Sequence, residues 1–80
     1  MVVKCKFKCV EVGEREGWSK EHPRFYVVKM SPVTGGSGEN DKFWEATPSG
    51  TFEFSNIISK FDFEVGREYY LTIEIAPKKE

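Results

Sequence analysis

The first segment of the chain alternates between apolar and basic side chains. The apolar positions are Val3, Cys5, Phe7 and Cys9, and the basic positions between them are Lys4, Lys6 and Lys8. This period of two predicts a β-strand over residues 2–12 with one apolar face. After Cys9 the apolar positions shift by one residue, to Val10 and Val12. Such a shift predicts a β-bulge that bends the strand, so that one strand serves both sides of a small core.

A second alternating segment covers residues 24–33. Its apolar side chains fall on both faces, with Tyr26, Val28 and Met30 on one and Phe25 and Val27 on the other. This pattern predicts either a central strand or a strand with one face covered by the preceding loop. That loop, residues 13–23, is polar apart from Trp18. We expect Trp18 to fold back as a lid on the core, and an exposed contact residue is the alternative.

The second half of the chain predicts a hairpin with arms at residues 42–47 and 51–56. Between the arms, Thr47-Pro48-Ser49-Gly50 has proline at its second and glycine at its fourth position, which favours a type I turn. The composition of residues 34–41 predicts a flexible loop. The glycines within it are followed by no Lys-Ser or Lys-Thr pair, so we expect no phosphate site there.

The last strand has the clearest alternation in the chain. Side chains expected to face inward are Tyr69, Leu71, Ile73 and Ile75, and those expected to face outward are Tyr70, Thr72 and Glu74. Before this strand, Asn56 can cap one helical turn over residues 56–61. We expect that turn to close one end of a barrel.

These elements predict an all-β fold: a small five-stranded antiparallel barrel with one short helical turn before the last strand. A helical turn between the fourth and fifth strands matches an SH3-like order. An OB-like barrel is the alternative, although it usually has its helix between the third and fourth strands. The 80 residues are expected to form one domain, residues 1–80, whose core depends on seven Phe, three Tyr and two Trp.

The charge of the chain is nearly balanced. Twelve basic residues against thirteen acidic residues leave a net charge of −1. A balanced domain attracts nucleic acid or an anionic membrane only weakly. No apolar run approaches the roughly 20 residues of a membrane span, and the first residues carry too many lysines for a secretory signal. We therefore expect no membrane association and a cytoplasmic location.

Few residues could carry chemistry. Cys5 and Cys9 would lie about 13 Å apart on one strand, whereas a disulfide spans at most about 7 Å. We expect both to be reduced thiols in the core. The single histidine, His22, lies in the polar loop and is expected to be solvated. No residues show the spacing of a metal site or a catalytic triad, so we expect no catalytic residues, no metal and no cofactor, and hence no enzyme.

Three short motifs resemble a known group of proteins. They are the turn Ala46-Thr47-Pro48-Ser49-Gly50, the step Phe63-x-x-Gly66 and the run Tyr69-Tyr70-Leu71. With residues 30–33, they are similar to small, mostly uncharacterised proteins of tailed bacteriophages, over roughly residues 24–76. This chain has Val65 where that group has proline. The resemblance implies a viral source, and hence the cytoplasm of a host cell or the virion, but it carries over no functional residues.

The leading interpretation is a non-enzymatic viral barrel that binds a protein, either as a virion component or as an inhibitor of a host protein. The alternative is a barrel that binds single-stranded nucleic acid through aromatic and basic side chains. A small-molecule sensor is a third option, for which no convergent polar groups are visible. Open edge strands would also permit a homo-oligomer. The candidate binding surface comprises Lys4, Lys6, Lys8, Trp18, Phe25 and Tyr70.

Overall fold

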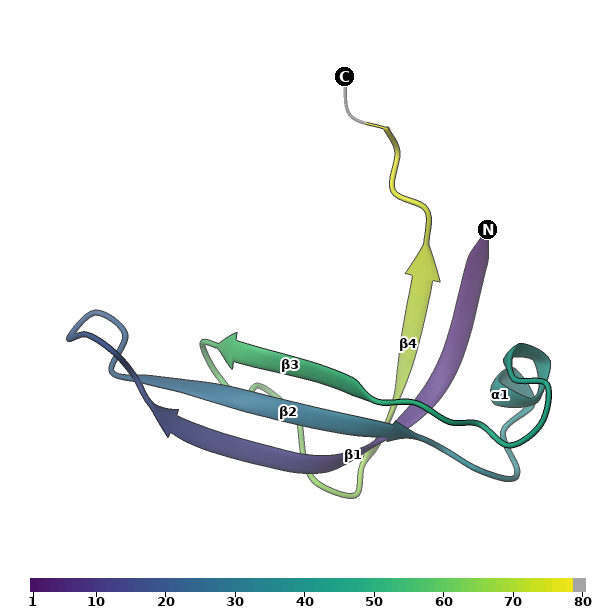
Figure 1. Ribbon diagram of the computed structural model, residues 1–80, viewed down its shortest axis with the longest axis horizontal. Coiled ribbons are helices and arrows are strands. Elements are labelled where there is room, and N and C mark those ends of the chain that lie inside the picture. Colours follow the sequence, from purple (N-terminus) through teal and green to yellow (C-terminus); the bar gives the residue numbers. More distant parts are fainter. Residues whose placement is uncertain (79–80) are drawn as a thin grey trace.

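One antiparallel sheet organises the part of the chain that the structure, a computed structural model, describes, which is residues 1–78. Its elements are β1 (Val2–Glu16), β2 (Arg24–Pro32), α1 (Gly38–Phe43), β3 (Phe52–Ile57) and β4 (Glu68–Glu74). The strands lie in the order β3-β2-β1-β4, and the sheet curls into an open half-barrel (Figure 1). The predicted all-β class is confirmed.

The bend predicted in the first strand is confirmed. Cys9 pairs with Met30, but the next pair joins Glu11 to Lys29, so Val10 is the extra residue of a β-bulge. On the N-terminal side of the bulge β1 pairs with β4, and its pairing with β2 runs from Phe7 to Glu16. The bent strand therefore belongs to both halves of the curled sheet.

The core lies on the inner face of the sheet. Its buried members are Cys5, Phe7 and Cys9 of β1 and Val28 and Met30 of β2. Half-buried rings close around them, and the Phe52 ring of β3 meets Phe7 edge-on at 6.3 Å between centroids. The expectation that both cysteines are buried thiols is confirmed. Val27, on the opposite face of β2, is also buried. β2 lies between β3 and β1, so the prediction of a central strand at this segment is confirmed.

The predicted strand at residues 42–47 is wrong, and residues 1–78 form four strands where five were expected. Residues 38–43 form α1, whose first turn is capped by the Ser37 hydroxyl accepting from the Asn40 N–H at 3.3 Å. Glu39 and Asp41 in that turn add favourable interactions with the helix N-terminus. The chain from Trp44 to Ser49 then closes a loop, because the Trp44 indole N–H donates to the Ser49 carbonyl at 3.0 Å. Local capping thus outweighs a short alternating pattern.

The helical turn predicted at residues 56–61, before the last strand, is also wrong. β3 continues through Asn56 to Ile57, and positive φ angles at Asn56 (61°) and Phe61 (48°) are incompatible with a continuous helical turn. The connection to β4 is instead held by the Tyr69 hydroxyl, which accepts from the Glu64 N–H at 2.8 Å and donates to the Asp62 carbonyl at 2.7 Å. A helix between β2 and β3 in a four-stranded sheet does not establish the SH3-like or OB-like order.

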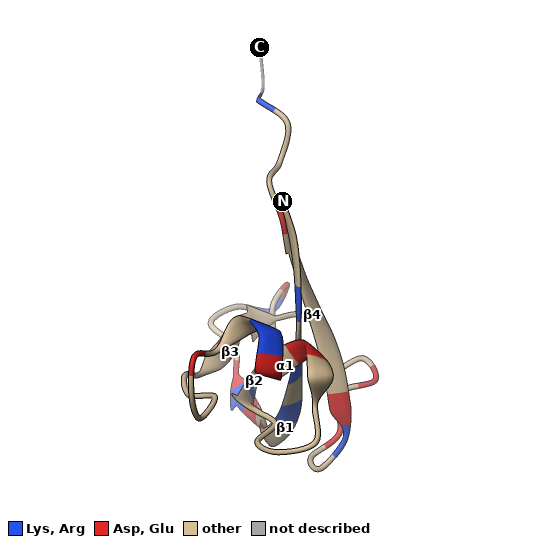
Figure 2. Ribbon diagram, turned by 90° about the vertical axis from the view of Figure 1, so that its right-hand side faces the viewer, with Lys and Arg blue, Asp and Glu red and all other residues tan. Residues whose placement is uncertain are grey.

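The inward alternation of β4 is confirmed only in its first half. Tyr69 and Leu71 pack against the core, but Ile73 and Ile75 are 52% and 71% exposed. The reason is that residues 2–4 pair with residues 72–74 in a two-stranded ribbon that projects beyond the other strands (Figures 1 and 2). We call this ribbon, with Ile75 directly after it, the terminal arm. The remaining residues around the core are called the sheet body. An apolar pattern that continues past the core leaves side chains in solvent.

Candidate functional site

Three of the predicted surface residues meet on the outer face of β1 and β4. Lys6 is opposite Tyr70 in the register of β1 and β4, and Lys4 is opposite Thr72, two residues after Tyr70. Both ammonium groups lie over the Tyr70 ring, with Nζ 4.9 Å from the centroid for Lys4 and 5.4 Å for Lys6. Cation–π attraction at these distances holds the two lysines over an exposed ring.

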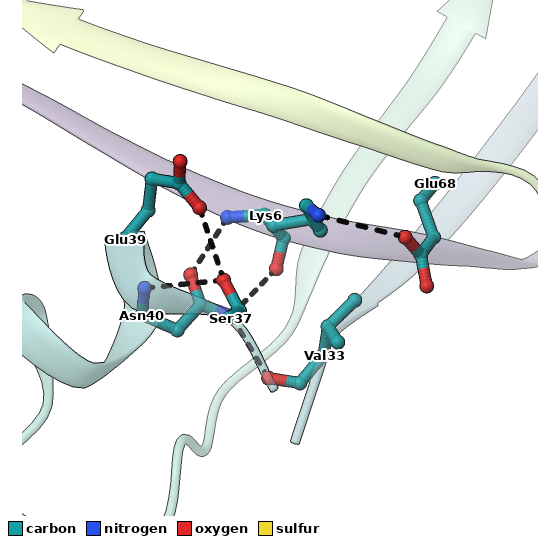
Figure 3. Close-up of polar contacts among 6 residues, drawn as sticks. All are labelled: Lys6, Val33, Ser37, Glu39, Asn40 and Glu68. Carbon is teal, nitrogen blue, oxygen red and sulfur yellow. Dashed lines mark hydrogen bonds and ion pairs between the residues drawn. The ribbon is translucent and has the colours of Figure 1, made fainter. Parts of the chain in front are cut away.

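Acidic side chains reduce the positive charge of this face. The Lys6 Nζ lies 3.8 Å from a carboxylate oxygen of Glu68 (Figure 3). Lys8, the third lysine of the series, is exposed and is opposite Glu68 in the register of β1 and β4. Both ion-pair partners are accessible to water, so the pair contributes little to stability. The face therefore combines three basic groups and an aromatic ring with one carboxylate that offsets part of their charge.

Trp18 and Phe25 form a second group, at the far end of the β1–β2 hairpin. Trp18 is 67% exposed, so the lid expected over the core is wrong and the alternative, an exposed aromatic, is correct. The long hairpin carries the loop past the core, as Figure 1 shows at the end opposite α1. There the indole packs against Phe25 at 5.6 Å and His22 at 5.4 Å between ring centroids. We call these three residues the Trp18 cluster.

The loop that carries the Trp18 cluster is tightly closed. The Gly17 N–H donates to the Pro23 carbonyl at 2.8 Å, directly beside the indole. A Cβ at Gly17 would lie only 1.6 Å from the His22 carbonyl oxygen, so this close approach of two backbone segments requires glycine. The indole is therefore presented from a loop whose ends are pinned.

Sequence reasoning missed Asn40, the most completely buried polar side chain near the lysine face. Its Oδ1 accepts from the Lys6 N–H at 2.7 Å, and its Nδ2 donates to the carbonyls of Lys6 at 2.8 Å and Val33 at 2.9 Å (Figure 3). The Ser37 cap followed by two acidic residues was a signal for α1. The contact with Lys6, 34 positions away, had no local signal.

The titratable groups give little sign of tuned chemistry. Burial raises the pKa of the Cys5 thiol, which disfavours the reactive thiolate. The pKa of Glu39 is lowered, first by a hydrogen bond to its own backbone and then by the Ser37 hydroxyl and the charges of Lys6 and Lys4. Across residues 1–78, no three His, Cys, Asp or Glu side chains gather as metal ligands would. Nor is any helix in that range long and apolar enough to cross a membrane.

Comparison with protein-family models, with curated proteins and with solved structures finds no match to this chain. Function is therefore inferred from the two surface groups and from the backbone edges of the sheet. Of the six predicted residues, Lys4, Lys6 and Tyr70 are in contact, Lys8 continues their face, and Trp18 and Phe25 lie apart from them.

Proposed function

We propose that this chain is a non-enzymatic domain that binds another protein, with the Trp18 cluster as its anchor. The observation that carries the proposal is an indole two-thirds exposed on a closed loop, supported from beneath by a half-buried Phe25. Tryptophan is among the residues that contribute most to protein interfaces, because it buries a large area at a low cost in side-chain entropy.

Preorganisation supports the same proposal. An exposed indole on a freely moving loop would lose conformational entropy on binding, which weakens association. Here the contacts of Trp18 with Phe25 and His22, and the hydrogen bond from Gly17 to Pro23, restrict the loop before any partner arrives. A partner with an apolar pocket could receive the indole with little rearrangement.

The resemblance to proteins of tailed bacteriophages supports two kinds of partner: a host protein in the cytoplasm or another component of the virion. We also propose that the sheet is an open relative of the five-stranded SH3-like and OB-like barrels. The bent β1 and the curl of the sheet support this kinship, and residues 1–78 supply four of the five strands such a barrel needs.

Affinity capture with a Trp18→Ala variant tests the binding function. The wild-type chain should retain a specific protein from host lysate or from dissociated virions, and Trp18→Ala should reduce its recovery by about tenfold or more. Phe61→Ala is the matched control, because the exposure of Phe61 (61%) is close to that of Trp18 but Phe61 lies on the β3–β4 connection. If neither source yields a protein whose recovery depends on Trp18, the proposal is wrong.

A second candidate function is binding of single-stranded nucleic acid on the lysine face. The favouring observation is the contact of Lys4 and Lys6 with the exposed Tyr70 ring, a basic and aromatic pair of the kind that holds bases and phosphates. Binding to oligo-dT should appear at about 50 mM salt and weaken steeply as salt rises. Tyr70→Ala should weaken it further. Absence of binding at low salt would remove this candidate, and the pairing of Lys6 with Glu68 makes it the weaker of the two.

A further inference from the structure

The side chain of Asn40 completes the hydrogen bonding of Lys6 where the pairing of β1 with β2 ends. The pairing of β1 with β2 begins at Phe7, opposite Pro32, so Lys6 lies just beyond the end of β2. There the Lys6 N–H donates to the Asn40 Oδ1 and the Lys6 carbonyl accepts from the Asn40 Nδ2 (Figure 3). A residue of a neighbouring strand would exchange the same two hydrogen bonds with Lys6. The Val33 N–H also donates to the Lys6 carbonyl at 3.0 Å, and the Asn40 Nδ2 donates to the Val33 carbonyl at 2.9 Å, so Asn40 bridges the two segments at the last position of the β1–β2 ladder.

Beyond Lys6, two positions of the same edge lack a partner strand within residues 1–78. Backbone groups along a strand point alternately to its two sides, so those of Val2 and Lys4 point to the same side as those of Lys6, away from β4. Beside them is a groove of about 410 Å³ between the start of β1 and α1. Its lining residues are Val2, Val3, Lys4, Gly38, Glu39, Lys42 and Phe43. An open edge of this kind is a template for another extended chain.

The terminal arm also exposes apolar side chains that the sheet body leaves uncovered. Val2 is 67% exposed, and Ile73 on the neighbouring strand and Ile75 just after that strand are more than half exposed. A two-stranded ribbon is marginally stable in water without a third strand or a covering layer. An occupant that completes this ribbon would therefore be a short extended segment that also presents apolar side chains.

We propose that this occupant is the same segment of a second copy, and that two chains pair β1 to β1, antiparallel, about a two-fold axis at Val3. Val2 of each copy then faces Lys4 of the other. Because these two residues have their N–H and carbonyl groups on the open side, the pairing forms four backbone hydrogen bonds. Val3 faces Val3 of the second copy, and each copy offers the same edge, as a two-fold interface requires.

Charge selects this register over its neighbours. An axis at Lys4 would place the two Lys4 side chains directly opposite each other, which is destabilising. With an axis at Val2, only Val2 of each copy would form backbone hydrogen bonds with the other copy. The pairing would then have two such hydrogen bonds in place of four. In the proposed register the Lys4 ammonium stays over the Tyr70 ring of its own chain, on the outer face. The lysine therefore does not obstruct the edge.

The outer edge of β4 is the competing site for a second copy. A two-fold axis at Leu71, the centre of that strand, would place Glu68 opposite Glu74 of the other copy at both ends. The proposed register of the β1 edge, with its axis at Val3, has no such conflict. Pairing there produces a continuous sheet in the order β4-β1-β1-β4 across the two chains, with Val3 and Ile73 of both copies on its inner face. The Trp18 cluster stays free, so this inference is independent of the proposed function.

Two matched proline variants distinguish the edges. Lys4→Pro removes an N–H from the open edge of β1. Thr72→Pro, at the residue opposite Lys4 in the register, removes an N–H from the outer edge of β4. Proline at an edge whose N–H faces solvent leaves the β1–β4 ladder intact. Sedimentation equilibrium over a concentration series should show a wild-type dimer. Lys4→Pro should weaken association by about tenfold or more, because the symmetric interface loses two hydrogen bonds. Thr72→Pro should dimerise as the wild type does.

A wild-type chain that remains monomeric at its highest attainable concentration would overturn the proposal. So would dissociation by Thr72→Pro but not by Lys4→Pro, since that result assigns the interface to β4. A cysteine variant covers the case in which Lys4→Pro fails to fold. The proposed register brings the two Val3 Cα atoms to about 4.5 Å, within disulfide range. Val3→Cys should therefore form a covalent dimer on mild oxidation, whereas Val10→Cys, exposed at the bulge, should not. Equal cross-linking of both variants would also contradict the proposal.

Discussion

The sheet body and the terminal arm are built from the same strand, β1, but differ in what completes them. In the body, β1 has neighbours on both sides, and its inward residues Phe7 and Cys9 are buried. In the arm, β1 has a neighbour, β4, on one side only. Ile73 of β4 continues the apolar alternation of that strand but is exposed. A period-two pattern therefore specifies which face of a strand is apolar but not whether anything covers that face. The body supplies its own cover, whereas in the proposed dimer a second copy completes the arm.

The largest expected difference between the two regions is the cost of truncating an apolar side chain. Met30→Ala removes a fully buried side chain of the body and should lower the free energy of unfolding by about 2–5 kcal/mol. Ile75→Ala, on the arm, should change it by less than about 0.5 kcal/mol at a dilution where the chain is monomeric. Urea denaturation followed by Trp fluorescence measures both. Similar losses for the two variants would show that the arm is packed against the body.

The junction between the two regions depends on Asn40. Asn40→Ala leaves the Lys6 N–H and the Val33 carbonyl without the amide partner that they have in the structure. Unsatisfied buried backbone groups are costly, so unfolding should become easier by about 2–3 kcal/mol. Ser55→Ala, which removes an exposed hydroxyl on β3, is the control and should be nearly neutral. A neutral Asn40→Ala would mean that water replaces the amide and that the cap of the β1 edge is dispensable.

The smallest effect concerns Glu39, at the groove beside the arm. Its pKa is lower in the folded chain, so its ionised form stabilises the fold. This contribution is present above the unfolded-state pKa and is lost as the pH falls through the lower folded-state pKa. The urea midpoint of the wild type should exceed that of Glu39→Gln at neutral pH, and the difference should shrink on acidification. A difference that does not vary with pH would assign the stabilisation to packing instead of charge.

The same contrast explains how much of the fold the sequence predicts. The bent β1 and its bulge were predictable, because the apolar phase changes once along a long alternating run. α1 was not predicted, because Trp44 and Ala46 alternate with Phe43 and Glu45 as in a strand and this pattern masked the capping signal at Ser37. The hydrogen bonds from Asn40 to Lys6 join residues 34 positions apart, so no local pattern predicts them. A turn at residues 56–61 could be capped by Asn56 but is not formed, since β3 continues to Ile57.

For the candidate site, sequence reasoning identified the residue types but not their grouping. Lys4, Lys6 and Lys8 share a face by their spacing alone, whereas the placement of Tyr70 beneath two of them requires the register of β1 with β4. Burial was expected for Trp18 from the average behaviour of large aromatics, but the length of the hairpin carries it away from the core. The open backbone edge at Val2 and Lys4 depends on where β2 ends, which no local pattern encodes.

Amide hydrogen exchange of the arm, followed residue by residue by NMR at several protein concentrations, tests most directly whether a second copy completes it. The Lys4 N–H points to the proposed interface and the Thr72 N–H to the outer edge of β4. We expect exchange of the Lys4 amide to slow as concentration rises, while exchange of the Thr72 amide stays fast throughout. Exchange at Lys4 that is independent of concentration would show that no second copy pairs with the β1 edge.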